Sequence, residues 1–309
     1  MWLLLLFAAP AWAASEWTIP VGESAGPPPL DPLDAAWTGA PAAAVPLYPQ
    51  ATAPGGLSRA YPKGHKSPLL QEARVLRGGG KLALRLAWPD ATADLADPRA
   101  TDRFADAAAV QFAPVDATLP YVGMGEPGRP VRVWLWRAGR PAESLTAQGF
   151  GSLARQPNEA VEAQARRTAT GWAVVLRGKE SADRPAAVAF ATWDGAEEGR
   201  AGRKRLSAWR ALAGMEPDGK LLEEARVGGD PARGASLYAE HGCAACHTAG
   251  VGLGPNLTHA GGIHWPGYLR RALLEPTAFV VPGYAAIMPA PPLRPEETDD
   301  LVAYLLTLH

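Results

Sequence analysis

Apolar and polar side chains alternate along several short stretches in the first two thirds of the chain. The clearest stretches are 81–88, 130–136, 171–178 and 186–193; the first reads KLALRLAW. Glycine, proline or aspartate bounds each of them, as in GGG at 78–80. Short alternating strands joined by turns predict an antiparallel β-sandwich. The segment 27–54 is rich in proline and alanine, and we expect an extended loop there.

A helical pattern replaces this alternation after residue 230. Asp230 and Pro231 form an N-cap with proline at the first helical position, which predicts a helix ending near His241. A second helix is expected over 265–275, where apolar positions follow helical spacing. The last helix follows Pro295 and carries four acidic residues in its first turns, which suits the positive end of a helix dipole. The C-terminal part is therefore expected to be all-α.

A polar, glycine-containing segment at 214–229 separates the two patterns. A chain of 309 residues commonly holds about two domains. We therefore expect a mainly β domain over 14–213, a linker over 214–229 and an all-α domain over 230–309.

The first thirteen residues predict a secretory signal peptide. An apolar run from Trp2 to Trp12 ends in the small-x-small triplet Ala11-Trp12-Ala13, which places cleavage after Ala13. The run lacks a lysine or arginine before it, so an uncleaved N-terminal anchor stays open as an alternative. No later stretch is long and charge-free enough to span a bilayer. We expect a soluble protein that is periplasmic or otherwise exported.

Composition adds two limits. The chain has 30 Lys and Arg against 31 Asp and Glu, which gives no global charge for binding nucleic acid. Its 33 glycines, 31 prolines and 11 tryptophans fit short strands joined by turns better than a helical bundle.

The only two cysteines lie in the motif Cys243-Ala244-Ala245-Cys246-His247. C-x-x-C-H is the attachment sequence of c-type haem. Two thiols three positions apart can each form a thioether to one vinyl group, and the following histidine then faces the iron. A structural zinc site needs four ligands and a thioredoxin-like pair needs a βαβ setting, and neither is present. A disulfide between Cys243 and Cys246 remains the simpler alternative.

The region 227–309 resembles a class I cytochrome c. The motifs that carry this resemblance are CAACH, GPNL at 254–257, IMP at 287–289 and the terminal PEETDDLVAYLLTL helix. It implies one covalent haem c with His247 and Met288 as axial ligands. His259 and His264 are rival ligands by residue type. The alternative for Met288 is a methionine that fills the core and does not bind the iron. An iron ligated by histidine and methionine has no open position, so such a domain passes electrons rather than activating substrate.

The β part resembles the gamma, haem b subunit of type II enzymes in the dimethyl sulfoxide reductase family. The similar blocks are 104–114, 120–138 and 188–209, and shorter blocks extend the resemblance over most of 17–213. It implies a β-sandwich that holds one non-covalent haem b, ligated by a methionine and a lysine. The chain departs from the family at Leu135 and Arg137, where a histidine and a lysine are common.

By this resemblance the haem b ligands are Met124 and Lys204. Met124 lies between two glycines in YVGMGEPG, which lets the backbone approach a bulky group. A ligating lysine must be neutral, although its free pKa is about 10.4. Two alternatives stay open: Lys204 is a solvated surface lysine, or Lys179 is the ligand in its place. We do not expect Met215 to ligate either haem.

The resemblances together imply an electron-transfer subunit rather than a catalytic one. Its expected partners are a molybdenum-containing catalytic subunit, an iron–sulfur subunit, and another cytochrome or a quinol-oxidising complex. Two alternatives come from other functional classes. One is a carbohydrate- or surface-binding β-sandwich fused to a monohaem cytochrome c, which needs an exposed aromatic platform. The other is a small haem oxidase or peroxidase, which needs an iron with an open position.

Overall fold

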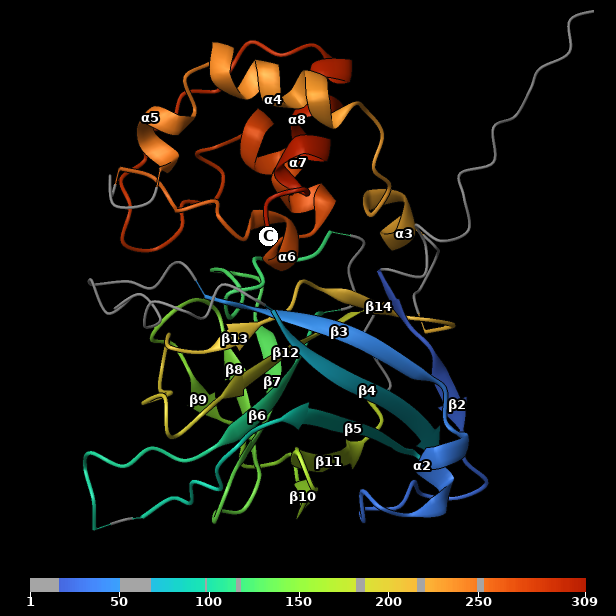
Figure 1. Ribbon diagram of the computed structural model, residues 1–309. Coiled ribbons are helices and arrows are strands. Elements are labelled where there is room, and N and C mark those ends of the chain that lie inside the picture. The colour runs from blue at the N-terminus through green and yellow to red at the C-terminus, as the bar shows by residue number, and fades with distance from the viewer. Residues whose placement is uncertain are drawn as a thin grey trace, which may run out of the picture.

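The computed structural model describes residues 17–50, 68–97, 99–114, 118–181, 187–215, 220–248 and 253–309. Strands dominate up to residue 212 and helices follow from 220 (Figure 1). The expected signal peptide lies outside the described residues. The strands are β1 (Thr18–Ile19), β2 (Val21–Glu23), β3 (Ala42–Pro49), β4 (Leu69–Gly78), β5 (Lys81–Pro89), β6 (Ala107–Phe112), β7 (Val131–Arg137), β8 (Glu143–Ala147), β9 (Ala154–Arg155), β10 (Val161–Arg167), β11 (Gly171–Lys179), β12 (Ala187–Trp193), β13 (Arg205–Leu206) and β14 (Arg210–Leu212).

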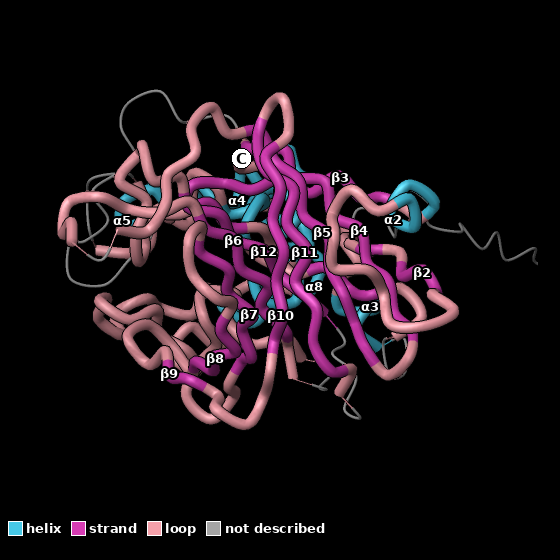
Figure 2. Tube along the Cα trace, turned by 90° about the horizontal axis from the view of Figure 1, so that it is seen from below, coloured by secondary structure: helices cyan, strands magenta, loops and turns pink. Residues whose placement is uncertain are grey.

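These strands form a mostly antiparallel sheet in the order β10-β11-β5-β4-β3-β13-β12-β6-β7-β8-β9. The sheet changes direction at β3, whose first residues pair with β4 and whose end pairs with β13. A buried cluster joins side chains from both halves, such as Leu84 of β5 and Phe190 of β12. The two halves therefore face each other across this core. Figure 2 shows β10, β11, β5 and β4 side by side.

The four alternating stretches of the sequence are strands, β5, β7, β11 and β12, as predicted. The expectation of an extended loop over 27–54 was wrong for the part that the structure describes. A short helix α2 (Ala35–Gly39) and the strand β3 lie there. Val45 and Leu47 are fully buried on one face of β3, so an alternating signal was present within the proline- and alanine-rich composition.

The helices are α3 (Lys220–Glu224), α4 (Pro231–Glu240), α5 (Ala244–His247), α6 (Ala260–Ile263), α7 (Pro266–Leu274) and α8 (Pro295–Leu305). The helix α4 begins as predicted, with the Asp230 carboxylate accepting from the Ala232 amide at 2.8 Å. A Cβ on Gly234 of α4 would lie 2.0 Å from the carbonyl oxygen of Asp300 in α8. This absence of a side chain lets the two helices cross in close contact (Figure 1).

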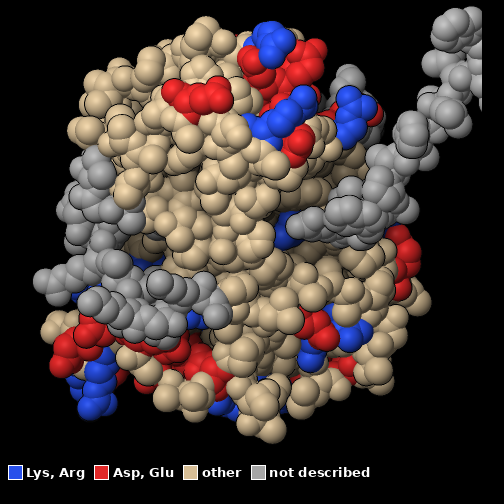
Figure 3. All heavy atoms as spheres, turned by 45° about the horizontal axis from the view of Figure 1, so that its top comes forward, with Lys and Arg blue, Asp and Glu red and all other residues tan. Residues whose placement is uncertain are grey.

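The segment expected to be a linker contains α3, and Leu221 and Ala225 are buried against the β part. None of the described helices combines the length and apolar character needed to cross a bilayer. Charged side chains gather over the helices and along the lower part of the β region, with few between them on the face drawn in Figure 3.

Candidate functional sites

A cavity lies on the outer face of β6, β7, β8, β12 and β13. Its volume is about 780 Å³, within the range of roughly 300–1,000 Å³ typical of cofactor sites. Strand alternation divides the side chains between two environments. Val110 and Trp134 belong to the core between the sheet halves, whereas four alanines line the cavity floor. These are Ala107, Ala109, Ala189 and Ala191. Small side chains on adjacent strands leave room for a flat ligand.

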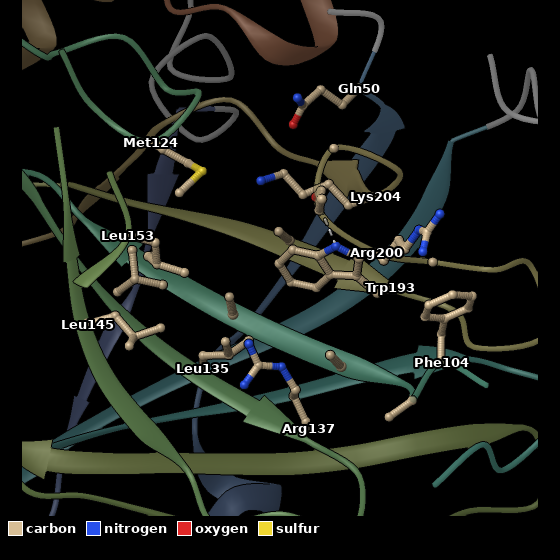
Figure 4. A pocket seen from close by; sticks show the side chains of 18 of the residues that line it. Gln50, Phe104, Met124, Leu135, Arg137, Leu145, Leu153, Trp193, Arg200 and Lys204 are labelled. Atoms are coloured by element: carbon tan, nitrogen blue, oxygen red, sulfur yellow. Dashed lines mark hydrogen bonds between the residues drawn. The ribbon is translucent and has the colours of Figure 1, made fainter. Parts of the chain in front are cut away.

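Met124 lines this cavity from the turn that precedes β7. Its φ of 73° is a left-handed conformation that costs a non-glycine residue about 1–3 kcal/mol. Three contacts hold the turn: the Gly149 amide donates to the Met124 carbonyl at 2.8 Å, the Met124 amide to the Val122 carbonyl at 2.9 Å, and the Gln111 side chain to the same Val122 carbonyl at 2.9 Å. The surrounding fold thus fixes a strained backbone that directs the thioether into the cavity (Figure 4).

Lys204 enters the same cavity from the residue before β13, and its amine extends towards the Met124 side (Figure 4). The side chain is 6% exposed, and burial lowers its pKa from 10.5 to about 8. Its Nζ lies over the Trp193 ring, 5.3 Å from the centroid, and no carboxylate of the described residues forms an ion pair with it. The rival Lys179 is exposed at the end of β11 and does not line the cavity.

The cavity lining is strongly basic on one side. Arg103, Arg137, Arg140 and Arg200 line it together with Lys204, and Asp97 is the single acidic side chain among its described lining residues. Arg137 is paired with Glu143, while Arg200 lies over the Phe104 ring at 4.8 Å. An apolar floor with a positive rim suits a flat apolar ligand that carries acidic groups on one edge.

Ala109→Phe is expected to remove most of any ligand from this cavity while Met124 and Lys204 stay in place. Ala109 pairs with Leu135 across β6 and β7, so an added ring has no space except the cavity itself. We would measure bound haem after reconstitution with excess haem. Ala109→Ser, which hardly changes the volume, serves as the control and should bind normally. Full haem binding by Ala109→Phe would contradict this placement.

A second cavity of about 250 Å³ lies among the C-terminal helices. It is lined by Cys243, Cys246, His247 and Met288, which the structure thus brings together from α5 and from the loop before α8. Both cysteines are free thiols, so the disulfide alternative is absent here. Burial raises the pKa of the Cys243 thiol.

The imidazole of His247 is oriented by its own loop. Its Nδ1 lies 2.8 Å from the Pro255 carbonyl oxygen, a contact that needs a proton on Nδ1 and leaves Nε2 as the free lone pair. A Cβ on Gly254 would lie 2.8 Å from the ring, so the glycine makes room for it. The arrangement prepares Nε2 to bind a metal ion.

The two rival histidines lie in different places. His259 is half-buried beside Tyr48 and does not line the C-terminal cavity. His264 lines it, stacks on Tyr268 at 4.8 Å, and has an Nδ1 without a hydrogen-bond partner among the described residues. Burial lowers the pKa of His264 to about 4, so the ring stays neutral at physiological pH. Met215 is a core methionine between the sheet halves.

The sequence did not single out Arg103 and Arg140 of the cavity lining, or the aromatic side chains beside the cavities, of which Phe150 lines the first and Tyr121 the second. Tyr121 stands three residues before Met124 in the YVGMG run, which was the available signal. The arginines come from distant segments, and only the fold assembles them.

Comparisons with known proteins identify both parts. A family model described as Ethylbenzene dehydrogenase matches residues 34–176, and one described as Cytochrome c matches 231–309. The putative respiratory nitrate reductase heme subunit ORF7 of Haloferax mediterranei is 36% identical over 194 residues, covering 59% of this chain and 67% of that one. The chlorate reductase subunit gamma of Ideonella dechloratans is 37% identical over 196 residues, covering 59% and 78%.

A third relative, the dimethylsulfide dehydrogenase subunit gamma of Rhodovulum sulfidophilum, is 34% identical over 167 residues, covering 47% of this chain and 60% of that one. A family 9 carbohydrate binding module from Caldicellulosiruptor kristjanssonii, in complex with cellotriose, aligns with 64% of this chain and 95% of its own at a TM-score of 0.36 and 11% identity, which is too low to bear on function. The chain belongs to the haem-binding gamma subunits of type II enzymes in the dimethyl sulfoxide reductase family, with a cytochrome c domain after the haem-binding domain.

Proposed function

We propose that the protein is an exported electron-transfer subunit that carries one haem b and one haem c in a single chain. The observation that carries this proposal is the presence of two separate cavities, each lined by a pair of side chains suited to axial ligation. Met124 and Lys204 line one, and His247 and Met288 line the other. Neither pair leaves the iron an open position, which favours electron transfer over the oxidase or peroxidase alternative.

In the β domain, the thioether of Met124 and the neutral amine of Lys204 would hold haem b, with the four floor alanines against the ring. The rim arginines Arg103, Arg140 and Arg200 would pair with its two propionates, because guanidinium groups bind carboxylates well. We take this part, residues 14–213, to be an antiparallel β-sandwich. The basic rim and alanine floor favour a haem over a carbohydrate, which needs an aromatic platform.

In the C-terminal domain, residues 230–309, the Cys243 and Cys246 thiols would form the thioethers of haem c, and His247 and Met288 would be its axial ligands. The hydrogen bond from His247 Nδ1 to the Pro255 carbonyl fixes the ring and leaves Nε2 free as the ligand atom. We take this domain to be an all-α class I cytochrome c. Each bound haem supplies a reversible one-electron couple.

The exposed apolar side chains Leu253 and Ile287, 50% and 58% exposed, lie at the rim of the haem c cavity. Small, weakly charged contacts are typical of transient electron-transfer complexes. We therefore propose that haem c exchanges electrons with another cytochrome or a quinol-oxidising complex. The β domain would face a molybdenum-containing catalytic subunit and its iron–sulfur subunit, as gamma subunits do in relatives of this family.

The test is a pyridine haemochrome spectrum of the protein purified from the periplasm. One covalent haem c and one extractable haem b per chain, together with co-purification of a molybdenum-containing subunit, are expected. Haem c alone, with the chain always isolated, would favour a monohaem cytochrome with a β domain of another use. A protein that keeps residues 1–13 at its N-terminus would contradict cleavage of the signal peptide.

A further inference from the structure

The C-terminal helices contact the β domain through one continuous hydrophobic cluster. Trp17 meets Trp265 edge to face, with ring centroids 5.3 Å apart. The Ala208 amide donates to the Gly262 carbonyl at 3.1 Å, which joins the two domains by a backbone hydrogen bond. A Cβ on Gly262 would lie 2.2 Å from the Tyr48 ring, so glycine is required at this close approach. These contacts hold the domains in one orientation.

At this junction the Tyr121 ring lies between the two cavities. It is 3% exposed and lines the C-terminal cavity, where its neighbours are Tyr268 and Phe279 at centroid distances of 5.5 and 5.1 Å. Phe150, which lines the cavity of the β domain, also packs edge to face on Tyr121, with ring centroids 6.1 Å apart. Two rings in contact thus form a wall shared by both cavities.

The same rings pack against the turn that carries Met124. A Cβ on Gly123 would lie 2.3 Å from the Tyr121 ring and 3.1 Å from the Phe150 ring. The Gly125 amide donates to the Tyr121 carbonyl at 3.0 Å, which closes the turn around Met124. Arg271 of α7 donates to the Leu119 carbonyl at 2.8 Å and anchors the segment before the turn to the helical domain. The Met124 turn is therefore held from both domains.

We propose that the Tyr121–Phe150 pair is the medium through which electrons cross directly between the two haem sites, without a swing of the cytochrome domain. This inference rests on the proposed dihaem function. The transfer moves one electron, oxidising one iron as it reduces the other, and no bond or proton moves. Electron transfer is faster through atoms in contact than through a gap, and the two rings, with centroids 6.1 Å apart, each line one of the cavities.

The experiment measures electron equilibration between the two haems of the full chain. A photoexcited ruthenium complex supplies one electron, and the separate α-bands of haem b and haem c report its distribution over time. Tyr121→Leu and Phe150→Leu are expected to slow equilibration several-fold, after correction for any change in haem content, spectra and reduction potentials measured in each variant. Tyr121→Phe, which keeps the ring, should equilibrate at the unaltered rate. Added glycerol should not slow the reaction, because no domain has to move.

The other possible outcomes separate a failure of this inference from a failure of the proposed function. Equal rates in both leucine variants, with both haems retained, would overturn the inference and leave the proposed function intact. A rate that falls with glycerol concentration would also overturn it, because a moving domain is then required. Both rings pack against the Met124 turn, so if the leucine variants lose haem b, the glycerol dependence of the unaltered protein decides the question. A natural chain that contains haem c alone would instead refute the proposed function.

Discussion

Replacement of both Cys243 and Cys246 by alanine is expected to abolish covalent haem and to unfold the C-terminal domain. The cavity they line has a volume of about 250 Å³. At about 24 cal/mol per Å³, an unfilled cavity of that size costs about 6 kcal/mol. A domain of about 80 residues has a net stability of roughly 4–12 kcal/mol, so the penalty removes much or all of it.

The measurements are haem staining after denaturing electrophoresis and far-ultraviolet circular dichroism of the full chain. The double variant should show no stained band and a smaller helical signal, while its haem b spectrum persists, because the cavity of the β domain contains neither cysteine. Cys243→Ala alone is the control, since one thioether still attaches the haem. A stained band in the double variant would contradict the assignment of the motif.

The local pattern predicted most of the secondary structure. Alternation located β5, β7, β11 and β12, and the N-cap at Asp230 located the start of α4, because each depends only on neighbouring residues. The strand β3 was missed because its prolines and alanines resemble a loop. Val45 and Leu47 are buried there because β3 pairs with β4, a strand that begins only at Leu69.

The candidate ligands were found from motifs, but their environments depend on the fold. Surrounded by Arg200, Arg203 and Arg205 in the sequence, Lys204 has the composition of a surface residue, yet it is buried. The turn before β13 gives neighbouring residues different surroundings: Arg203 pairs with Glu198, whereas Lys204 enters the cavity. The contact between the two domains could not be predicted from the sequence either, because Trp17 and Trp265 are 248 positions apart and meet only in the folded chain.

The burial of Lys204 makes its amine ready to bind a metal at a cost in stability. Its pKa in the fold is about 8 against 10.5 in water, so the unfolded chain holds the proton more tightly. The resulting penalty on the haem-free fold is present in full below pH 8 and disappears above about pH 10.5. A difference of this size corresponds to about 3 kcal/mol at pH 7. Because its pKa is lowered, the Lys204 amine loses its proton for ligation at a far smaller cost in free energy than the amine of a solvated lysine.

Lys204→Leu is therefore expected to stabilise the haem-free protein at pH 7 by up to about 3 kcal/mol while it destroys the haem b site. In the unaltered protein, haem b affinity should fall about tenfold for each pH unit below 8, because one proton competes with the iron for the amine. Lys204→Leu should bind haem b weakly, as a five-coordinate high-spin species, with no such pH dependence.

Two control variants test the role of the lysine. Lys204→Arg, which cannot deprotonate, should also lose the ligand, and Lys179→Leu should behave as the unaltered protein. Haem titrations from pH 6 to pH 8 and thermal unfolding of the haem-free forms measure these effects; a six-coordinate low-spin spectrum in Lys204→Leu would exclude lysine ligation.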